Sequence, residues 1–463
     1  TTTILINSDP RSGTSVTSQA AAFVNGASVP GIPCYSEASA DVQSSALGIS
    51  YSTSDTNSDC SGIGPRPPVQ AGICDLDVRP AATLLLPYFE VNLDDPSGIT
   101  TLCSINNASA TAVLAHVVVW SDLSVPVLDF NIYLTGYDVQ TVNLRDILVG
   151  GILPRTASQG QDPADTISPQ GDFSQDINFA SCAGQLPPPV LPGLFITHLQ
   201  NSLTGQFSSI LNGCAGRSRG DRIARGYVTI DTINNCTLRF PGDPGYFVAG
   251  GRGDATNQNV LWGDYDFVNP GQNVSYADTL VHIEADATNP ETSVPGEYTF
   301  YGRFVGWTAA DNREPLATNF GARFISGGSF NGGTDLLVWR DSKVAQGAFK
   351  CGTVPAWFPL GQEQILIFDE QENPEQGELI KPFPAEANRS KVDGADFPVT
   401  PGFGWLYLNL NTTVTAAGAN PPEDPAATQA WVSVVRTAEG RFASGYDALR
   451  IDNACQAVHG GIP

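Results

Sequence analysis

Residues 216–220 read GRSRG and match G-x-S-x-G, the nucleophile elbow of serine hydrolases, with Ser218 as the candidate nucleophile. In that elbow a strained turn between an apolar strand and a helix exposes the serine hydroxyl above a parallel sheet. The flanking segments here, NGCA before the match and Asp221 and Arg222 after it, are not an apolar strand and a helix. We therefore interpret the match as coincidental, and the sequence predicts no catalytic residue and no enzyme.

Acidic side chains gather in loops, which is the arrangement that Ca²⁺ uses when it binds six to eight oxygen ligands in irregular geometry. The clusters are Asp94 and Asp95; Asp162, Asp165, Asp172 and Asp176; and Asp369, Glu370, Glu372, Glu375 and Glu378. No D-x-[DN]-x-[DN]-G loop is present. A solvated acidic surface is the simpler interpretation, and the alternative is a Ca²⁺ site at Asp162, Asp165, Asp172 and Asp176. No other cofactor is expected.

Arg-Gly-Asp occurs twice, at 219–221 and 252–254, and an exposed glycine turn that presents opposite charges is typical of a receptor-binding loop. Turns that end strands are the alternative. Aromatic residues could also line a sugar cleft beside paired carboxylates, as in glycosidases. The tryptophans available are Trp120, Trp262, Trp307, Trp339, Trp357, Trp405 and Trp431. Most lie in apolar strand candidates, which favours core packing, and no carboxylate spacing singles out an acid and a base.

Composition restricts the partners. The 463 residues carry a net charge of -24 with only 15% charged residues, and strong acidity disfavours nucleic acid, whose phosphates need clustered Lys and Arg. The four lysines are Lys343, Lys350, Lys381 and Lys391, so the first 342 residues have only arginine as a cation. No apolar run is long enough for a membrane helix. The chain contains no methionine and starts at Thr1, from which we expect a secreted protein whose signal peptide has been removed.

Nine cysteines are scattered without a CxxC pair, which favours disulfides of an oxidising compartment over zinc, redox or haem motifs. The disulfide candidates are Cys34, Cys60, Cys74, Cys103, Cys182, Cys214, Cys236, Cys351 and Cys455. The pairing is open. The odd count leaves one cysteine over, either as a buried thiol or as an intermolecular bridge.

Strand patterns dominate from residue 79 to 268, which we interpret as a first antiparallel β-sandwich, immunoglobulin-like or jelly-roll-like. A turn at 94–98 predicts that its first two strands form a hairpin. The expected strands are 84–93, 99–105, 113–120, 127–134, 139–147, 226–231 and 260–262. A strand-poor insertion spans about 150–222, with one short helix expected at 193–205.

The remaining residues, 269–463, read as a second β-sandwich. Its expected strands are 298–307, 336–339, 364–368, 405–410, 431–437 and 442–451, and the last two flank a hairpin loop at 438–440. Residues 1–78 read as an extended, disulfide-tied arm. Its β-branched run at 2–6 either pairs within its own chain, which we favour, or is donated to a neighbour.

Two resemblances accompany these patterns. The segment from Thr100 to Ile147 resembles an immunoglobulin-like module of bacterial surface proteins, because an Asn-rich turn follows one strand and a late strand reads YDVQTVNL. The phrases ARGYVTIDTINNC, NREPLATNFGARF and GGTDLLVWRDS are similar to uncharacterised secreted bacterial proteins. The resemblance implies secretion and a bacterial source, and no activity.

The sequence therefore predicts an extracellular structural protein that acts through protein contacts, as a self-assembling subunit of a surface layer, filament or matrix. The expected partners are further copies of the chain, with no nucleic acid and no membrane span. The alternative from another class is an adhesin that binds carbohydrate or a receptor, and a secreted hydrolase is a third.

Overall fold

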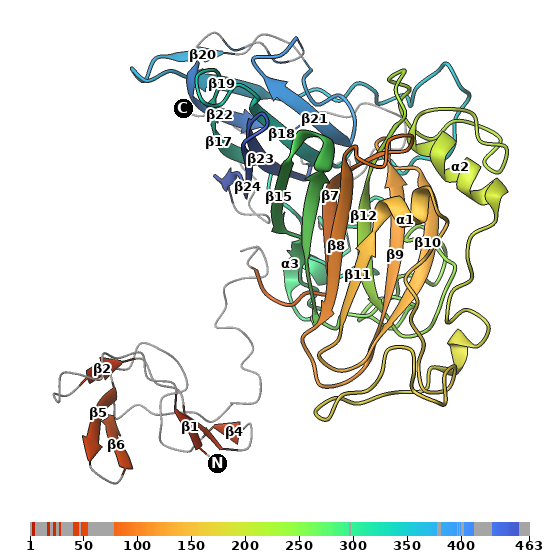
Figure 1. The fold of residues 1–463 in the computed structure, drawn as a ribbon, viewed down its shortest axis with the longest axis vertical. Coiled ribbons are helices and arrows are strands. Elements are labelled where there is room, and N and C mark those ends of the chain that lie inside the picture. The colour runs from red at the N-terminus through yellow and green to blue at the C-terminus, as the bar shows by residue number, and fades with distance from the viewer. Residues whose placement is uncertain are drawn as a thin grey trace. The chain divides into compact units, whose positions relative to one another are not determined.

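The computed structural model describes residues 78–452 except 296–297, 377–380, 396, 398, 400–401 and 412–427, and, before residue 78, the backbone of six short strands. The chain divides into two compact units, residues 1–72 and 73–463. Strands make up nearly all of the regular structure in both, and every ladder is antiparallel, which confirms the all-β prediction (Figure 1).

The first unit contains two three-stranded sheets. One sheet contains β1 (Thr2–Ile4), β3 (Ala22–Val24) and β4 (Ala27–Ser28). The other contains β2 (Val16–Ser18), β5 (Ala40–Ser45) and β6 (Gly48–Thr53). The β-branched run at the start of the chain thus pairs with β3 of its own chain, the favoured expectation. Short paired strands stand where the sequence suggested an extended arm. Cys34, Cys60 and Cys74 lie outside the described residues.

The first sandwich of the second unit consists of two five-stranded sheets. The strand order in one sheet is β10 (Pro126–Leu134), β9 (Val113–Ser121), β12 (Ile223–Ile233), β7 (Thr83–Asn92) and β16 (Val281–Ile283). The order in the other is β11 (Val139–Asn143), β8 (Thr100–Asn107), β14 (Asp264–Asn269) and β15 (Val274–Thr279), and β13 (Leu261–Trp262) also pairs with β8. Strand β9 is buried along its whole length because protein covers both faces of its sheet. This burial explains its unbroken apolar sequence.

The second sandwich consists of a five-stranded and a four-stranded sheet. The strand order in the five-stranded sheet is β20 (Pro374–Gln376), β19 (Gln364–Phe368), β22 (Phe403–Asn409), β17 (Asn319–Ile325) and β25 (Leu449–Arg450). The strand order in the four-stranded sheet is β21 (Ala387–Val392), β18 (Gly333–Arg340), β23 (Ala430–Ala438) and β24 (Phe442–Asp447). Strands β23 and β24 form the hairpin expected at 438–440. The predicted strand at 442–451 is divided, because β24 and β25 belong to different sheets.

The hairpin predicted at 94–98 is wrong. Strands β7 and β8 belong to opposite sheets, so the chain crosses the sandwich at this turn. The cause is Arg145, whose guanidinium donates hydrogen bonds of 2.6–2.9 Å to four backbone carbonyls around the turn. Arg145, 47 positions after Gly98, thus holds the path of the turn, and local turn chemistry does not reveal this contact.

The strand predicted at 298–307 is also wrong. Its described residues form consecutive turns, and Gly306 and Trp307 have positive φ angles of 64° and 58°, which a strand does not allow. The aromatic rings that suggested a strand pack inward instead. The ring centroid of Phe300 lies 5.4 Å from that of Trp339, and the ring centroid of Phe304 lies 5.3 Å from that of Trp120.

The core of the first sandwich extends into the second, which also has an apolar core of its own. Trp339 and Trp431 of the second sandwich belong to the same buried apolar cluster as Leu84 and Val117 of the first. The boundary expected between residues 268 and 269 falls inside β14, and the next two strands, β15 and β16, pair with strands of the first sandwich. The mostly polar sequence of β15, VSYADT, and the three-residue length of β16 hid these strands in the sequence.

Helices are short. They are α1 (Leu144–Leu148), α2 (Gly193–Leu203), α3 (Pro290–Ser293) and the 3-10 turns η1 (Ala180–Cys182) and η2 (Pro270–Gln272). Helix α2 confirms the helix expected inside the 150–222 insertion, where the structure assigns no named strand. Among the residues that the structure describes, no helix has the length and apolar character needed to cross a membrane.

Candidate functional site

Three of the four aspartates proposed as Ca²⁺ ligands accept hydrogen bonds within the chain, and the fourth, Asp172, is exposed. Asp162 accepts from the backbone N–H groups of Thr166 and Ile167, both at 2.6 Å, and the hydrogen bonds to these groups lower its pKa. Asp165 accepts from the N–H of Gln170 at 3.1 Å, and Asp176 accepts from the hydroxyl of Tyr133. Across the described parts of the chain, no three His, Cys, Asp or Glu side chains are arranged to hold a metal ion.

The charges of both Arg-Gly-Asp segments are engaged within the chain. Asp221 forms a salt bridge of 2.8 Å with Arg225, and Arg219 lies 3.3 Å from Asp122. In the second segment, the carboxylate of Asp254 lies 3.1 Å from Arg239. The exposed hydroxyl of Ser218 accepts a hydrogen bond from a glutamine side chain at 3.2 Å. A turn-forming role accounts for both motifs.

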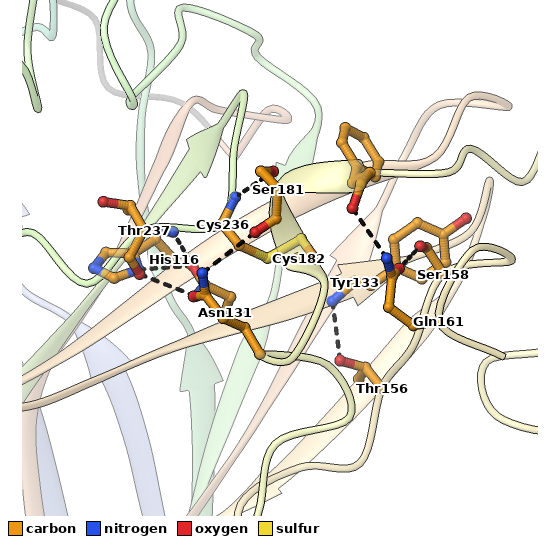
Figure 2. Close-up of a disulfide and its surroundings, with 12 residues drawn as sticks. His116, Asn131, Tyr133, Thr156, Ser158, Gln161, Ser181, Cys182, Cys236 and Thr237 are labelled. Atoms are coloured by element: carbon orange, nitrogen blue, oxygen red, sulfur yellow. Dashed lines mark hydrogen bonds between the residues drawn. A yellow bond between two sulfur atoms is a disulfide. The ribbon is translucent and has the colours of Figure 1, made fainter.

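Figure 2 shows how the Cys182–Cys236 disulfide ties the insertion to the loop that follows β12. Beside it, the Asn131 side chain on β10 donates to the carbonyl of Thr237 at 3.0 Å and accepts from the N–H of Thr237 at 3.2 Å. The ring of His116 on β9 contacts the same amide oxygen at 3.1 Å. Because each partner is buried, this cluster fixes the loop against the sheet.

The second disulfide connects the two sandwiches. Cys214 lies in the insertion of the first sandwich, and Cys351 follows β18 of the second, 137 residues later. Backbone hydrogen bonds in both directions between Cys214 and Phe349 accompany it, at 2.8 and 2.9 Å. Cys103 is a buried free thiol whose pKa burial raises to about 12. Cys455 lies outside the described residues.

A buried charge cluster lies at the same junction. The guanidinium of Arg303 binds both carboxylate oxygens of Glu386, at 2.6 and 2.8 Å, and lies 3.3 Å from the carboxylate of Asp341. All three side chains are at most 2% exposed. From the first sandwich, Ser124 donates to Glu386 and accepts from Arg303 at 3.3 Å, and it also contacts the hydroxyl of Tyr227 at 2.7 Å.

A second charge network crosses the junction nearer the surface. Glu90 on β7 forms salt bridges with two arginines. Arg225, from the same sandwich, lies 3.2 Å from its carboxylate, and Arg389, from β21 of the second sandwich, lies 2.8 Å from it. Arg389 in turn binds Asp335 on β18 at 2.6 Å. Burial alone would raise the pKa of Glu90, but Arg389 and Arg225 outweigh it and hold the pKa below its ordinary value. The carboxylate therefore stays charged and keeps both cations in place.

A cavity of about 290 Å³ opens between β15–β16 and β23–β25. Its lining includes Trp431, Asp447, Arg450 and His282. Burial, and next the carboxylate of Asp278, raise the pKa of Asp447 to about 7, although Asp447 accepts hydrogen bonds of 3.0 Å from Trp431 and Ser433.

His282 is the polar group of this cavity that stands out. It is 5% exposed, its Nε2 accepts from the N–H of Gly263 at 3.2 Å, and burial lowers its pKa to about 4. The imidazole is therefore neutral, and its Nδ1–H has no hydrogen-bond partner among the residues that the structure describes. An unsatisfied buried donor of this kind costs about 1–3 kcal/mol and favours a ligand or water that accepts from it.

Most tryptophans serve the core, as expected. Trp262 and Trp405 are 43% and 37% exposed, and the other five are at most 7% exposed. Sequence reasoning missed Arg303 and Glu386, although Arg303 is a charge within an aromatic segment, FYGRFVGW, and this placement signals a buried pair. Comparisons with protein-family models, with curated proteins and with solved structures found no match to this chain.

Proposed function

We propose that this protein is an extracellular structural subunit that acts through protein contacts and assembles with further copies of itself into a surface layer, filament or matrix. The observation that carries the proposal is the junction between the sandwiches. The Cys214–Cys351 disulfide, the Arg303–Glu386 pair and the shared core join the two sandwiches into one rigid body. A subunit that must transmit position or load to its neighbours needs such rigidity.

The disulfides support the extracellular location. Disulfides persist in oxidising compartments and are rare in the cytosol, where thiols are kept reduced. Both bridges fasten long connections to the sheets, so the fold depends on an environment that preserves them. The bacterial source indicated by the sequence resemblance remains part of the proposal.

Self-association of the full chain tests the proposal. The oxidised protein is analysed by size-exclusion chromatography with light scattering over a hundredfold concentration range, and the same fractions are imaged by negative-stain electron microscopy. We expect a mass that rises with concentration and ordered particles larger than one chain. A strict monomer in both measurements, at every concentration and ionic strength, would refute the structural role.

The cavity beside His282 supports a second candidate, an adhesin that binds carbohydrate. An aromatic ring, a carboxyl group, a guanidinium and an unsatisfied N–H around about 290 Å³ are the groups that recognise a small polyhydroxylated ligand. A glycan array separates the candidates. Binding that disappears in Arg450→Ala and persists in Arg441→Ala, a control on the exposed β23–β24 loop, would favour the adhesin.

A further inference from the structure

The outer face of the sheet β20–β19–β22–β17–β25 carries exposed apolar side chains. On β22 the exposure alternates, so that Phe403 and Trp405 are each 37% exposed while Gly404 and Leu406 are buried. On β19 the same alternation leaves Phe368 half-buried on this face. We call Phe368, Phe403 and Trp405 the aromatic patch. Its strands lie at one end of the 73–463 unit (Figure 1).

The patch is ordered before any partner binds. In the strand register Phe368 lies opposite Trp405, and Trp405 lies opposite Arg323. The rings of Phe368 and Trp405 stack with centroids 4.3 Å apart and planes 6° apart, and the guanidinium of Arg323 lies 5.9 Å from the centre of the Phe403 ring. Side chains that already hold one another lose little conformational entropy on association, and exposed Trp and Arg are typical hot-spot residues of interfaces.

Charges of opposite sign flank the patch. Arg323 on β17 is exposed on one side. On the other side, the loop between β19 and β20 contains Asp369, Glu370 and Glu372, of which the two glutamates are exposed. The hydrogen bonds that Asn373 donates to Asp369 lower the pKa of Asp369 and keep it charged. Across this face the order is therefore acidic loop, aromatic rings, arginine.

We propose that the aromatic patch is a contact between two copies of this chain, related by a twofold axis that passes through the Phe368–Trp405 stack. The order of charges is self-complementary about such an axis, because it places Arg323 of each copy against the acidic loop of the other. This proposal identifies one contact of the assembly and rests on the structural function proposed above. A layer or filament requires at least one additional contact elsewhere on the chain.

Sedimentation velocity of the full chain over a concentration series tests the surface. We expect Trp405→Ala to raise the dissociation constant of the dimer about 10- to 100-fold, as truncation of a central aromatic hot spot does. Trp262→Ala is the matched control, since Trp262 is similarly exposed, at 43%, on the sheet of the other sandwich. It should change the constant less than about threefold, within the range of a neutral interface or surface substitution.

Charge reversal tests the geometry with variants that leave the apolar packing intact. Arg323→Glu should weaken the dimer about tenfold or more, and adding Glu370→Arg and Glu372→Arg in the same chain should restore it, because the reversed charges meet again across the axis. Circular dichroism and melting temperature establish that each variant is folded. If neither Trp405→Ala nor Arg323→Glu weakens self-association, the aromatic patch is not the contact, and the proposed structural role is unaffected. Loss without rescue would overturn the twofold pairing, and a monomeric wild type would overturn both proposals.

Discussion

Removal of the Glu386 carboxylate should destabilise the protein more than any exposed substitution, because it leaves Arg303 buried without its main partner. Glu386 binds Arg303 through two hydrogen bonds of 2.6 and 2.8 Å, and neither side chain is more than 2% exposed. Breaking such a pair costs about 3–5 kcal/mol. Asp341 remains 3.3 Å from Arg303 and offsets part of the loss, so we expect about 3 kcal/mol for Glu386→Ala.

A double-mutant cycle measured by equilibrium urea unfolding separates the pair from its surroundings. Arg303→Met should cost a similar amount, whereas the double variant should cost much less than the sum, because no buried charge is left without its partner. Asp94→Ala is the control. Its partner Arg222 lies 3.4 Å away with both side chains about half exposed, and such a pair contributes less than about 1 kcal/mol. Additive losses in the cycle would show that Arg303 and Glu386 do not act as a pair.

Three further outcomes are expected. The contribution of Asp447 to stability should fall from about pH 4 to pH 7, by up to about 4 kcal/mol, because its raised pKa of about 7 makes the folded state bind the proton more tightly than the unfolded state. His282, whose pKa is lowered to about 4, changes stability in the opposite direction over part of this interval, so the Asp447 contribution is measured as the difference between wild type and Asp447→Asn in urea titrations at each pH. Replacement of both Cys214 and Cys351 by Ser should cost about 3–5 kcal/mol in the same assay, since the bridge spans 137 residues. Iodoacetamide at pH 8 should alkylate Cys103 only after unfolding, as peptide mass spectrometry would show, because its pKa is about 12.

The sequence predicts the strands of the fold best where burial alone decides them. Strand β9 is an unbroken apolar run, and β19 at 364–368 has the bounds expected from its pattern. The failures occur where distant groups decide. Arg145 turns the chain between sheets at 94–98, and the aromatic segment at 298–307 folds into turns because its rings fill the gap between the sandwiches.

The candidate sites were harder to predict, because they depend on the register between sheets. Asp447 and His282 are 165 positions apart and line one cavity because β15, which leads into β16, contacts β24. The aromatic patch likewise joins β19 and β22, which are adjacent in the sheet, although Phe368 and Phe403 are 35 positions apart in the chain. A spacing rule along the chain detects neither arrangement.

The low charge and the preference for arginine follow from this architecture. Arg303, Arg313 and Arg340 are all buried, and each satisfies several acceptors at a junction between sheets or loops. Within the part of the chain that the structure describes, Arg340 forms no salt bridge and donates instead to backbone carbonyls, among them those of Phe383 at 3.0 Å and Leu410 at 2.6 Å. Burial lowers the pKa of Arg340 to about 9.

A planar guanidinium with five N–H groups can satisfy several diverging acceptors, whereas the ammonium group of lysine has three N–H donors at a single point. These three buried arginines are therefore structural, whereas other cations, such as Arg222, Arg239 and Arg323, are exposed. Arg323 differs in its surroundings, because it lies beside exposed aromatic rings on the outer face of a sheet. Acidic residues outnumber basic residues by 47 to 23, so a second copy presents mainly carboxylates, and an arginine held beside aromatic rings can pair with them while the rings pack. This combination favours the aromatic patch as the surface that meets another acidic copy.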